Sequence, residues 1–201
     1  MISKLPLTER CPLVSRIIAG VAGGLRLENV PGSNTRPTTD RVKEALFSRL
    51  ETYDILNGSR VLDLFAGSGA LGCESMSRGA AHVDFCETYA KAQSVVEKNV
   101  AAVVKANPAS TSRVHRMSAR AFLANYSSAP WDLVFIDPPY SLENDELEEL
   151  LEALGNHLAD GAVAVVERSS RTAEPQWPDT MEKFADRKYG ETVLYFAEPS
   201  A

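Results

Sequence analysis

From residue 60 to residue 167 the chain alternates short apolar runs with longer segments in which apolar residues recur every three or four positions. The short runs predict strands and the longer segments predict helices. The strands are expected at 60–65, 82–87, 113–117, 133–136 and 162–167. The helices are expected at 70–78, 90–106, 120–125 and 145–158. Such alternation is typical of a parallel sheet with helices on both faces, so the sequence predicts an α/β fold.

Both ends of the chain depart from this alternation. Near the N-terminus, the runs 15–19 and 25–30 flank "GVAGG" and predict a hairpin. Thr39 is a candidate N-cap for a following helix with one apolar face. At the C-terminus, "KFADRKYGETVLYFAE" predicts a hairpin, which would make the last strand of the sheet antiparallel. We therefore expect a small hairpin-and-helix extension over residues 1–54 and a main domain over residues 55–201.

Charge also separates these two parts. Residues 1–50 contain eight basic and four acidic side chains, a balance of +4. Because the whole chain carries a net charge of −6, the remaining 151 residues sum to −10. A basic segment on an acidic body is suited to nucleic-acid phosphates. Ordinary surface charge would give the same count.

No apolar stretch approaches the ~18 residues of a membrane span, and charges and prolines interrupt the first twenty residues, unlike a signal peptide. These features predict a cytoplasmic protein without membrane contact. The three cysteines (Cys11, Cys73 and Cys86) lack CxxC spacing, so neither a disulfide framework nor a zinc site is expected.

A glycine motif follows the first strand of the alternating region. The stretch "LDLFAGSGALG" places Gly67, Gly69 and Gly72 in G-x-G-x-x-G spacing, where the backbone can turn sharply and approach a ligand at a helix N-terminus. Glu87 follows about twenty residues later, at the end of the second strand, where an acid can hold ribose hydroxyls. The spacing predicts a nucleotide-like cofactor and leaves both a dinucleotide and S-adenosylmethionine open.

The fourth strand of this region ends in "FIDPPYS", an apolar run that stops at an acid, two prolines and a tyrosine. Pro138 and Pro139 restrict the backbone and carry no N–H group, so the loop offers fixed hydrogen-bond acceptors beside Asp137. Tyr140 adds a flat aromatic face. Acceptors beside an aromatic face suit a planar substrate with an amino group, such as a nucleobase taken out of its stack. The alternative is a rigid surface turn.

The stretches 137–140 and 63–72 together resemble the (D/N)-P-P-(Y/F) and glycine motifs of S-adenosylmethionine-dependent amino methyltransferases. Three further stretches are similar to the bacterial RsmD-like enzymes, which methylate N2 of a guanine in 16S ribosomal RNA. They are "RIIAG" (16–20), "TRPTTDRVKEALF" (35–47) and "ALGCESMSRGA" (70–80). The resemblance covers about residues 15–197.

This resemblance implies a Rossmann-like, seven-stranded methyltransferase sheet, mostly parallel with its last strand antiparallel, behind a small N-terminal extension. It implies that S-adenosylmethionine contacts Asp63, Phe65, Ala66, Gly67, Ser68, Gly69, Glu87, Thr88, Ser118 and Ala119. The target-base and catalytic site would comprise Asp137, Pro138 and Tyr140. The sequence departs from the family at Tyr89, where an acid is frequent, and at Ser118, where Asp or Asn is common.

The implied partner is 16S rRNA in a small-subunit particle or assembly intermediate. The resemblance also implies that the enzyme is a monomer. Phosphate contacts are expected from Arg16, Arg26, Arg36, Thr38, Arg41 and Lys43. We expect direct in-line methyl transfer that relies on alignment and on acceptor atoms beside the amine, without a metal ion or a covalent nucleophile.

Three other functions remain open at this stage. A DNA or protein-glutamine amino methyltransferase would share the Asp-Pro-Pro-Tyr stretch. A nicotinamide-dependent oxidoreductase would share the glycine motif but leaves that stretch and the basic segment unexplained. An RNA-binding assembly factor without catalysis would be expected to have a damaged glycine motif, whereas this one is intact.

Overall fold

The computed structural model describes residues 15–31 and 40–200, and within them it contains seven strands and five helices. The strands are β1 (Arg60–Asp63), β2 (His82–Cys86), β3 (Thr111–His115), β4 (Trp131–Ile136), β5 (Leu158–Ser169), β6 (Met181–Tyr189) and β7 (Thr192–Pro199). The helices are α1 (Asp40–Thr52), α2 (Ala70–Ser77), α3 (Ala90–Ala106), α4 (Ala119–Asn125) and α5 (Asn144–Gly155).

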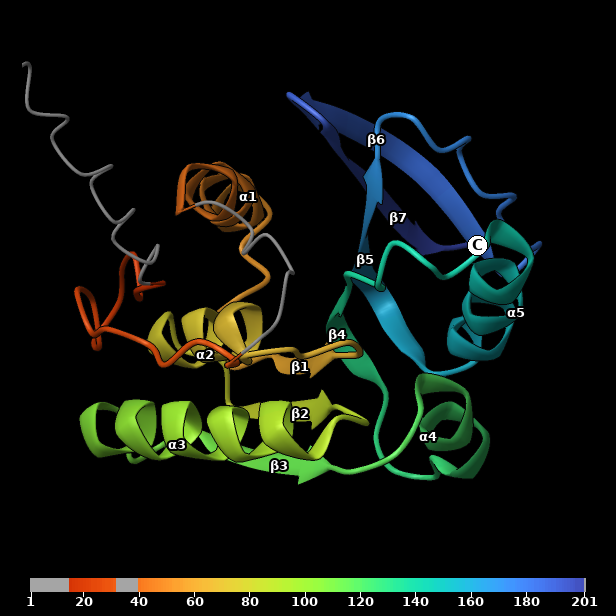
Figure 1. Ribbon diagram of the computed structural model, residues 1–201. Coiled ribbons are helices and arrows are strands. Elements are labelled where there is room, and N and C mark those ends of the chain that lie inside the picture. The colour runs from red at the N-terminus through yellow and green to blue at the C-terminus, as the bar shows by residue number, and fades with distance from the viewer. Residues whose placement is uncertain (1–14, 32–39, 201) are drawn as a thin grey trace, which may run out of the picture.

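The strands form one sheet in the order β3-β2-β1-β4-β5-β7-β6 (Figure 1). Strands β1 to β5 pair in parallel, and β7 pairs antiparallel with both β5 and β6. The predicted seven-stranded, mostly parallel α/β fold with an antiparallel last strand is therefore confirmed. Several boundaries differ by two to four residues: the strands predicted at 113–117 and 162–167 are Thr111–His115 and Leu158–Ser169. The helix predicted to reach residue 158 ends at Gly155, because Leu158 already pairs with Trp131 in the sheet.

Alternate residues of the central strands supply two separate cores, one on each face of the sheet. Val61 and Phe135 belong to the core under α1, α2 and α3. Leu62 and Val134, their neighbours in sequence, belong to the core under α4 and α5. Figure 1 shows α2 and α3 on one side of the sheet and α4 and α5 on the other.

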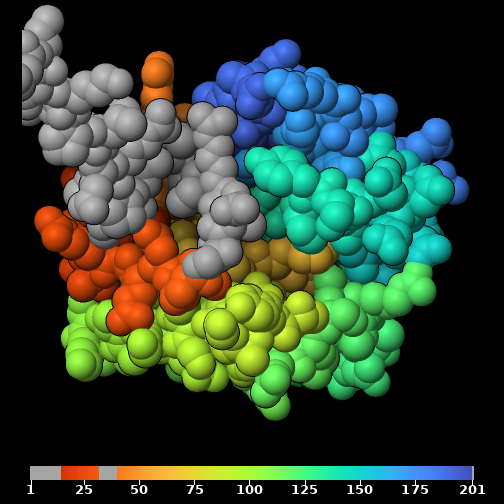
Figure 2. Space-filling model, viewed as in Figure 1, coloured from red at the N-terminus to blue at the C-terminus, as the bar shows by residue number. Residues whose placement is uncertain are grey.

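Residues 15–31 form a tight turn held by a single antiparallel bridge between Arg16 and Arg26. The predicted hairpin is thus present in reduced form, without a regular strand pair. Ile17, Ala22 and Leu27 are buried in the same core as α1, α2 and α3, and Figure 2 shows this segment lying against the yellow-green surface of α3. The described part of the extension therefore shares the main core.

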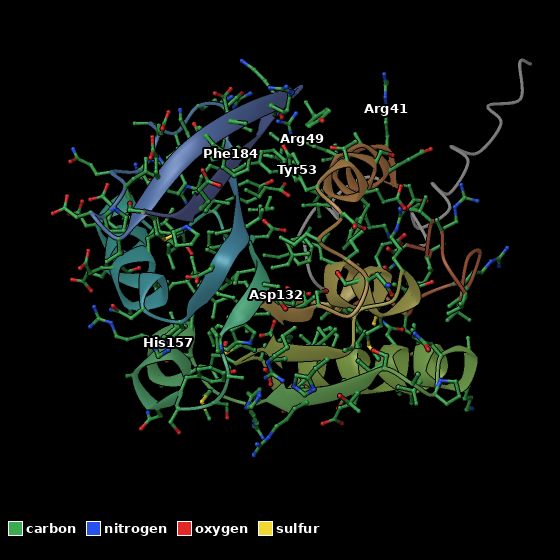
Figure 3. The ribbon with its side chains drawn as sticks, turned by 180° about the vertical axis from the view of Figure 1, so that it is seen from behind. Arg41, Arg49, Tyr53, Asp132, His157 and Phe184 are labelled. Carbon is green, nitrogen blue, oxygen red and sulfur yellow. The ribbon has the colours of Figure 1, made fainter. Side chains whose placement is uncertain are left out.

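Helix α1 buries Leu46 and Leu50 of the predicted apolar face, and it also buries Phe47, which was not predicted. The candidate cap Thr39 lies outside the described residues. At its C-terminal end the Arg49 guanidinium stacks 5.4 Å from the Tyr53 ring, which meets Phe184 of β6 edge-on (Figure 3). These contacts fix α1 against the C-terminal hairpin.

Glu74 of α2 fastens the N-terminal turn to the helix that follows the glycine motif. Its buried carboxylate accepts hydrogen bonds from the backbone N–H groups of Ile18 and Ala19 at 2.7 and 3.0 Å and from Arg78 Nε at 2.8 Å. The Lys43 ammonium lies 3.9 Å from the same carboxylate. A buried charge with this many partners holds three chain segments in one arrangement.

Candidate active site

The carboxyl ends of the parallel strands surround a cavity of about 440 Å³. Open α/β sheets bind ligands at this edge, because the loops that leave the strands there are free to form a crevice. The cavity is lined by Ser15, Asp63, Leu64, Phe65, Ala66, Gly67, Ser68, Ala70, Leu71, Cys86, Glu87, Thr88, Met117, Ser118, Ala119, Asp137, Pro138, Pro139, Tyr140 and Glu167.

The structure brings twelve of the thirteen predicted cofactor and base residues to this one cavity. The exception is Gly69, which caps α2 with a left-handed φ of 76° and donates its N–H to the Ala66 carbonyl. Sequence reasoning missed Ser15, Met117 and Glu167 as lining residues. Glu167 could have been found by the rule used for Asp137, since it too lies near the carboxyl end of a parallel strand.

The N–H groups of the three motif glycines are occupied by groups of the protein. Gly67 donates to Glu87 Oε2 at 2.9 Å, Gly72 donates to Asp63 Oδ2 at 3.0 Å, and Gly69 donates to the Ala66 carbonyl. Gly72 also needs to be glycine, because a Cβ there would lie 2.2 Å from the Phe85 ring. These three N–H groups are therefore not available to cradle a pyrophosphate.

The cavity is acidic. Asp63, Glu87, Asp137 and Glu167 line it, and no Lys, Arg or His does so within residues 15–31 and 40–200. Burial raises the pKa of the Asp63 carboxyl from 3.8 to about 7; the hydrogen bond from Gly72 opposes this shift and the charge of Glu87 adds to it. The site therefore favours a cationic ligand over an anionic one.

Glu87 is held in place by two backbone donors. Its Oε1 accepts from the Tyr89 N–H at 2.7 Å, and its Oε2 accepts from Gly67. Each carboxylate oxygen retains a further acceptor position. A pair of vicinal hydroxyl groups, such as those of a ribose, can use these positions.

The Asp-Pro-Pro-Tyr loop combines an exposed aromatic ring with a buried proline. Pro138 is buried, whereas the Tyr140 residue is 75% exposed. Beneath the loop, Arg168 Nη2 donates to Asn144 Oδ1 at 2.9 Å, and Asn144 Nδ2 donates to the Ala173 carbonyl at 3.0 Å. The ring is thus accessible for stacking, and the start of α5, four residues after it, is tied to the end of β5.

The N-terminal turn and the glycine loop share one buried side chain. Asn99 of α3 accepts from the Glu28 N–H at 2.8 Å and donates both to the Glu28 carbonyl at 3.0 Å and to the Ser68 carbonyl at 2.8 Å. Ser15 of the same turn lines the cavity. The extension is therefore anchored directly beside the cofactor loop.

The predicted RNA contacts differ in how accessible they are. Arg26 and Arg41 are exposed, and Figure 3 shows Arg41 pointing away from α1. Arg16 is also exposed, although Nε forms an ion pair with Asp40 at 3.2 Å. Arg36 and Thr38 lie outside the described residues.

The prediction for Lys43 is wrong. Its side chain is 1% exposed, and its ammonium donates to the Arg16 carbonyl and faces Glu74. Burial lowers the pKa of this ammonium, while the charge of Glu74 opposes the shift. Lys43 stabilises the interior and cannot reach a phosphate group.

None of the described helices is long and apolar enough to cross a bilayer. The described residues also contain no group of three or more His, Cys, Asp or Glu side chains arranged to hold a metal ion.

Comparison with known proteins gives consistent matches over nearly the whole chain. The family model described as Conserved hypothetical protein 95 matches residues 15–198. Ribosomal RNA small subunit methyltransferase D of Escherichia coli (strain K12) is 37% identical over 81% of this chain and 79% of its own length. The Bacillus subtilis (strain 168) protein YlbH is 34% identical over 88% of this chain and 95% of its own.

Among solved structures, the Escherichia coli protein yhhF superposes with a TM-score of 0.79 at 34% identity, covering 92% of this chain and 98% of that one. The family model extends over both the N-terminal turn and the sheet. The chain therefore belongs to the Conserved hypothetical protein 95 family, whose members include the RsmD-type methyltransferases.

Proposed function

We propose that this protein transfers a methyl group from S-adenosylmethionine to the exocyclic N2 of one guanine in the 16S rRNA of the small ribosomal subunit. The observation that carries the proposal is the acidic cavity that joins the glycine loop to the Asp-Pro-Pro-Tyr loop. It is supported by the 37% identity to a ribosomal RNA small subunit methyltransferase. The substrate places the enzyme in the cytoplasm, where it acts as a monomer.

The residues of the cavity fit this cofactor. S-adenosylmethionine supplies a methyl group on a cationic sulfonium, and it carries a ribose and an α-amino group as well. Asp63 and the loop 65–69 would hold the amino-acid part, and Glu87 would accept from the ribose hydroxyls. Thr88, Ser118 and Ala119 would surround the adenine. An NAD-type dinucleotide fits less well, because its phosphates would face carboxylates and occupied N–H groups.

At the base site, Tyr140 would stack on the guanine, and Asp137 with the Pro138 carbonyl would accept from the hydrogens of the amino group. The amino lone pair is delocalised into the ring, so acceptors that favour a pyramidal nitrogen make it more nucleophilic. The new N–C bond would form as the S–CH3 bond of the donor breaks, with S-adenosylhomocysteine as the leaving group. Positive charge passes to the nitrogen, and the Asp137 carboxylate stabilises that charge. The excess proton then leaves to Asp137 or to water.

Cofactor affinity should depend on pH through Asp63. The folded carboxyl has a pKa of about 7 against 3.8 for the ordinary group. Between these values the unfolded carboxyl is ionised and folding takes up a proton, so stability falls as pH rises through that window. A cationic ligand favours the ionised form, so its binding releases the proton. We expect affinity for S-adenosylmethionine to rise about five- to tenfold from about pH 6 to 7.5. Both pH values lie below the usual pKa of an α-amino group, so the amino group of the ligand stays mainly protonated over this range.

Isothermal titration calorimetry measures this effect directly, in two buffers of different ionisation enthalpy. The Asp63→Asn variant serves as the control and should bind weakly with a flat pH profile. A wild-type affinity that does not change over this range would contradict the role of Asp63.

RNA binding would use the exposed arginines of the extension. In the Arg26→Ala/Arg41→Ala double variant, binding to small-subunit particles should weaken, and the slope of log K against log salt should decrease by about one per lost phosphate contact. Lys105→Ala, an exposed cation at the end of α3, is the matched control. Filter binding between low and high salt tests this. Equal slopes for the double variant and the wild type would exclude these arginines from the contact.

The function is tested by offering labelled S-adenosylmethionine with three substrates: small-subunit particles that lack the modification, DNA and a glutamine-containing protein. We expect incorporation into the particle RNA alone. Incorporation into DNA or protein would favour one of the other amino methyltransferase activities.

A further inference from the structure

Glu167 is a second carboxylate at the base site, and its position follows from strand register. Phe135 of β4 pairs with Val165 of β5, and both side chains belong to the core under α1, α2 and α3. Two residues further on, Asp137 and Glu167 project from the same face at the carboxyl end of the sheet. Both line the large cavity. Two neighbouring strands therefore deliver one carboxylate each to the same place.

A small recess opens beside this pair. Its volume is about 20 Å³, and Asp137, Tyr140, Glu167 and Arg168 contribute to its walls. This is enough room for one group of the size of a water molecule. Thr192 also lines it and donates to Glu167 Oε1 at 3.5 Å. Ligand atoms that enter the recess would meet the Asp-Pro-Pro-Tyr loop on one side and the end of β5 on the other.

Arg168, the residue after Glu167, anchors the end of β5 on the other face of the sheet. The residue is 7% exposed, and its Nη2 donates to Asn144 Oδ1 at 2.9 Å. Burial lowers the pKa of this guanidinium, and the charge of Glu143 opposes the shift. At the recess, Asp137 and Glu167 therefore present two carboxylates side by side.

This arrangement matches the edge of a guanine. That edge presents the N2 amino group and N1–H as donors and O6 as an acceptor, in that order. Adenine offers an unprotonated N1 and an amino group at C6, which is the opposite pattern. Ionised carboxylates only accept. Asp137 and Glu167 therefore offer two neighbouring acceptors, which match the N2 amino group and N1–H of guanine.

We propose that Glu167 determines the choice of base: it accepts a hydrogen bond from N1–H of the guanine whose amino group lies at Asp137. This inference rests on the proposed function and adds the residue that selects guanine. A base without N1–H would leave the carboxylate facing a lone pair, and sites built for one hydrogen-bond pattern reject such analogues strongly.

The test compares guanine with 2-aminopurine, which keeps the amino group at C2 but has an unprotonated N1 and no O6. Small-subunit particles are reconstituted with either base at the mapped target position, and kcat/KM is measured for the wild type and for Glu167→Gln. The amide can donate to an unprotonated N1. Glu182→Gln is the control, an exposed glutamate of β6 that lines neither cavity.

We expect the wild type and Glu182→Gln to prefer guanine, and Glu167→Gln to reduce the guanine to 2-aminopurine ratio at least about tenfold with unchanged affinity for S-adenosylmethionine. If Glu167→Gln slows both substrates equally, or loses cofactor affinity at a constant ratio, the inference is overturned and the proposed function stands. A wild type that methylates neither particle overturns the proposed function and this inference with it.

Discussion

Replacing Asp137 with alanine is expected to lower kcat for methyl transfer by about 10²–10³-fold. The carboxylate stands at the carboxyl end of β4, beside two prolines that fix its backbone and within the cavity that the glycine loop closes on the other side. In the proposed mechanism, alanine would remove the acceptor that faces the amine and would leave the growing positive charge without a counter-charge. The loss should therefore appear in kcat, with cofactor affinity little changed.

Single-turnover methyl incorporation into unmodified small-subunit particles measures this effect. Asp137→Asn is the matched variant, because it keeps one acceptor oxygen in nearly the same shape and should retain more activity than alanine. An Asp137→Ala protein with full turnover would remove Asp137 from the chemistry.

Replacing Glu74 with alanine is expected to reduce the free energy of unfolding by about 3–5 kcal/mol. The variant would leave Lys43 buried without its opposite charge and would leave the N–H groups of Ile18 and Ala19 without their acceptor. Because these groups anchor the N-terminal turn on α2, the damage should spread to the cofactor loop.

Urea unfolding followed by circular dichroism measures the change. Glu51→Ala is the control, because Glu51 also pairs with Arg78 but its side chain is 56% exposed, and exposed pairs contribute little. The free energy of unfolding of Glu74→Gln should lie between those of Glu74→Ala and Glu51→Ala, since an amide oxygen can still accept one of the backbone hydrogen bonds. Equal stability of Glu74→Ala and Glu51→Ala would contradict the structural role of Glu74.

The sheet and most of the cavity could be predicted from the sequence because the signals are local. The Asp63 to Gly72 stretch contains a strand end, a glycine turn and a helix start within ten residues, and each part has its own sequence pattern. The same holds for Asp137 at the end of an apolar run. Most of the predicted site residues follow the end of a strand, so the order of the strands brings them together at one edge of the sheet.

The remaining features depend on contacts between distant segments. Lys43 has the sequence of a solvent-exposed cation, and only its approach to Glu74, 31 positions later, makes it an interior residue. Glu167 lies at the end of a predicted strand, but its place beside Asp137 depends on the pairing of β5 with β4 and on its register. Gly69 fits the motif spacing, yet its role is to start α2 rather than to line the cavity.

The most direct measurement maps the modified nucleotide by mass spectrometry, after incubating unmodified small-subunit particles with S-adenosylmethionine and either the wild type or Asp137→Ala. The wild type should convert one guanine of the 16S rRNA to N2-methylguanosine, and the Asp137→Ala variant should leave that position largely unmodified. A methyl group on another atom or base, or the same yield from both proteins, would contradict the proposed site and its chemistry.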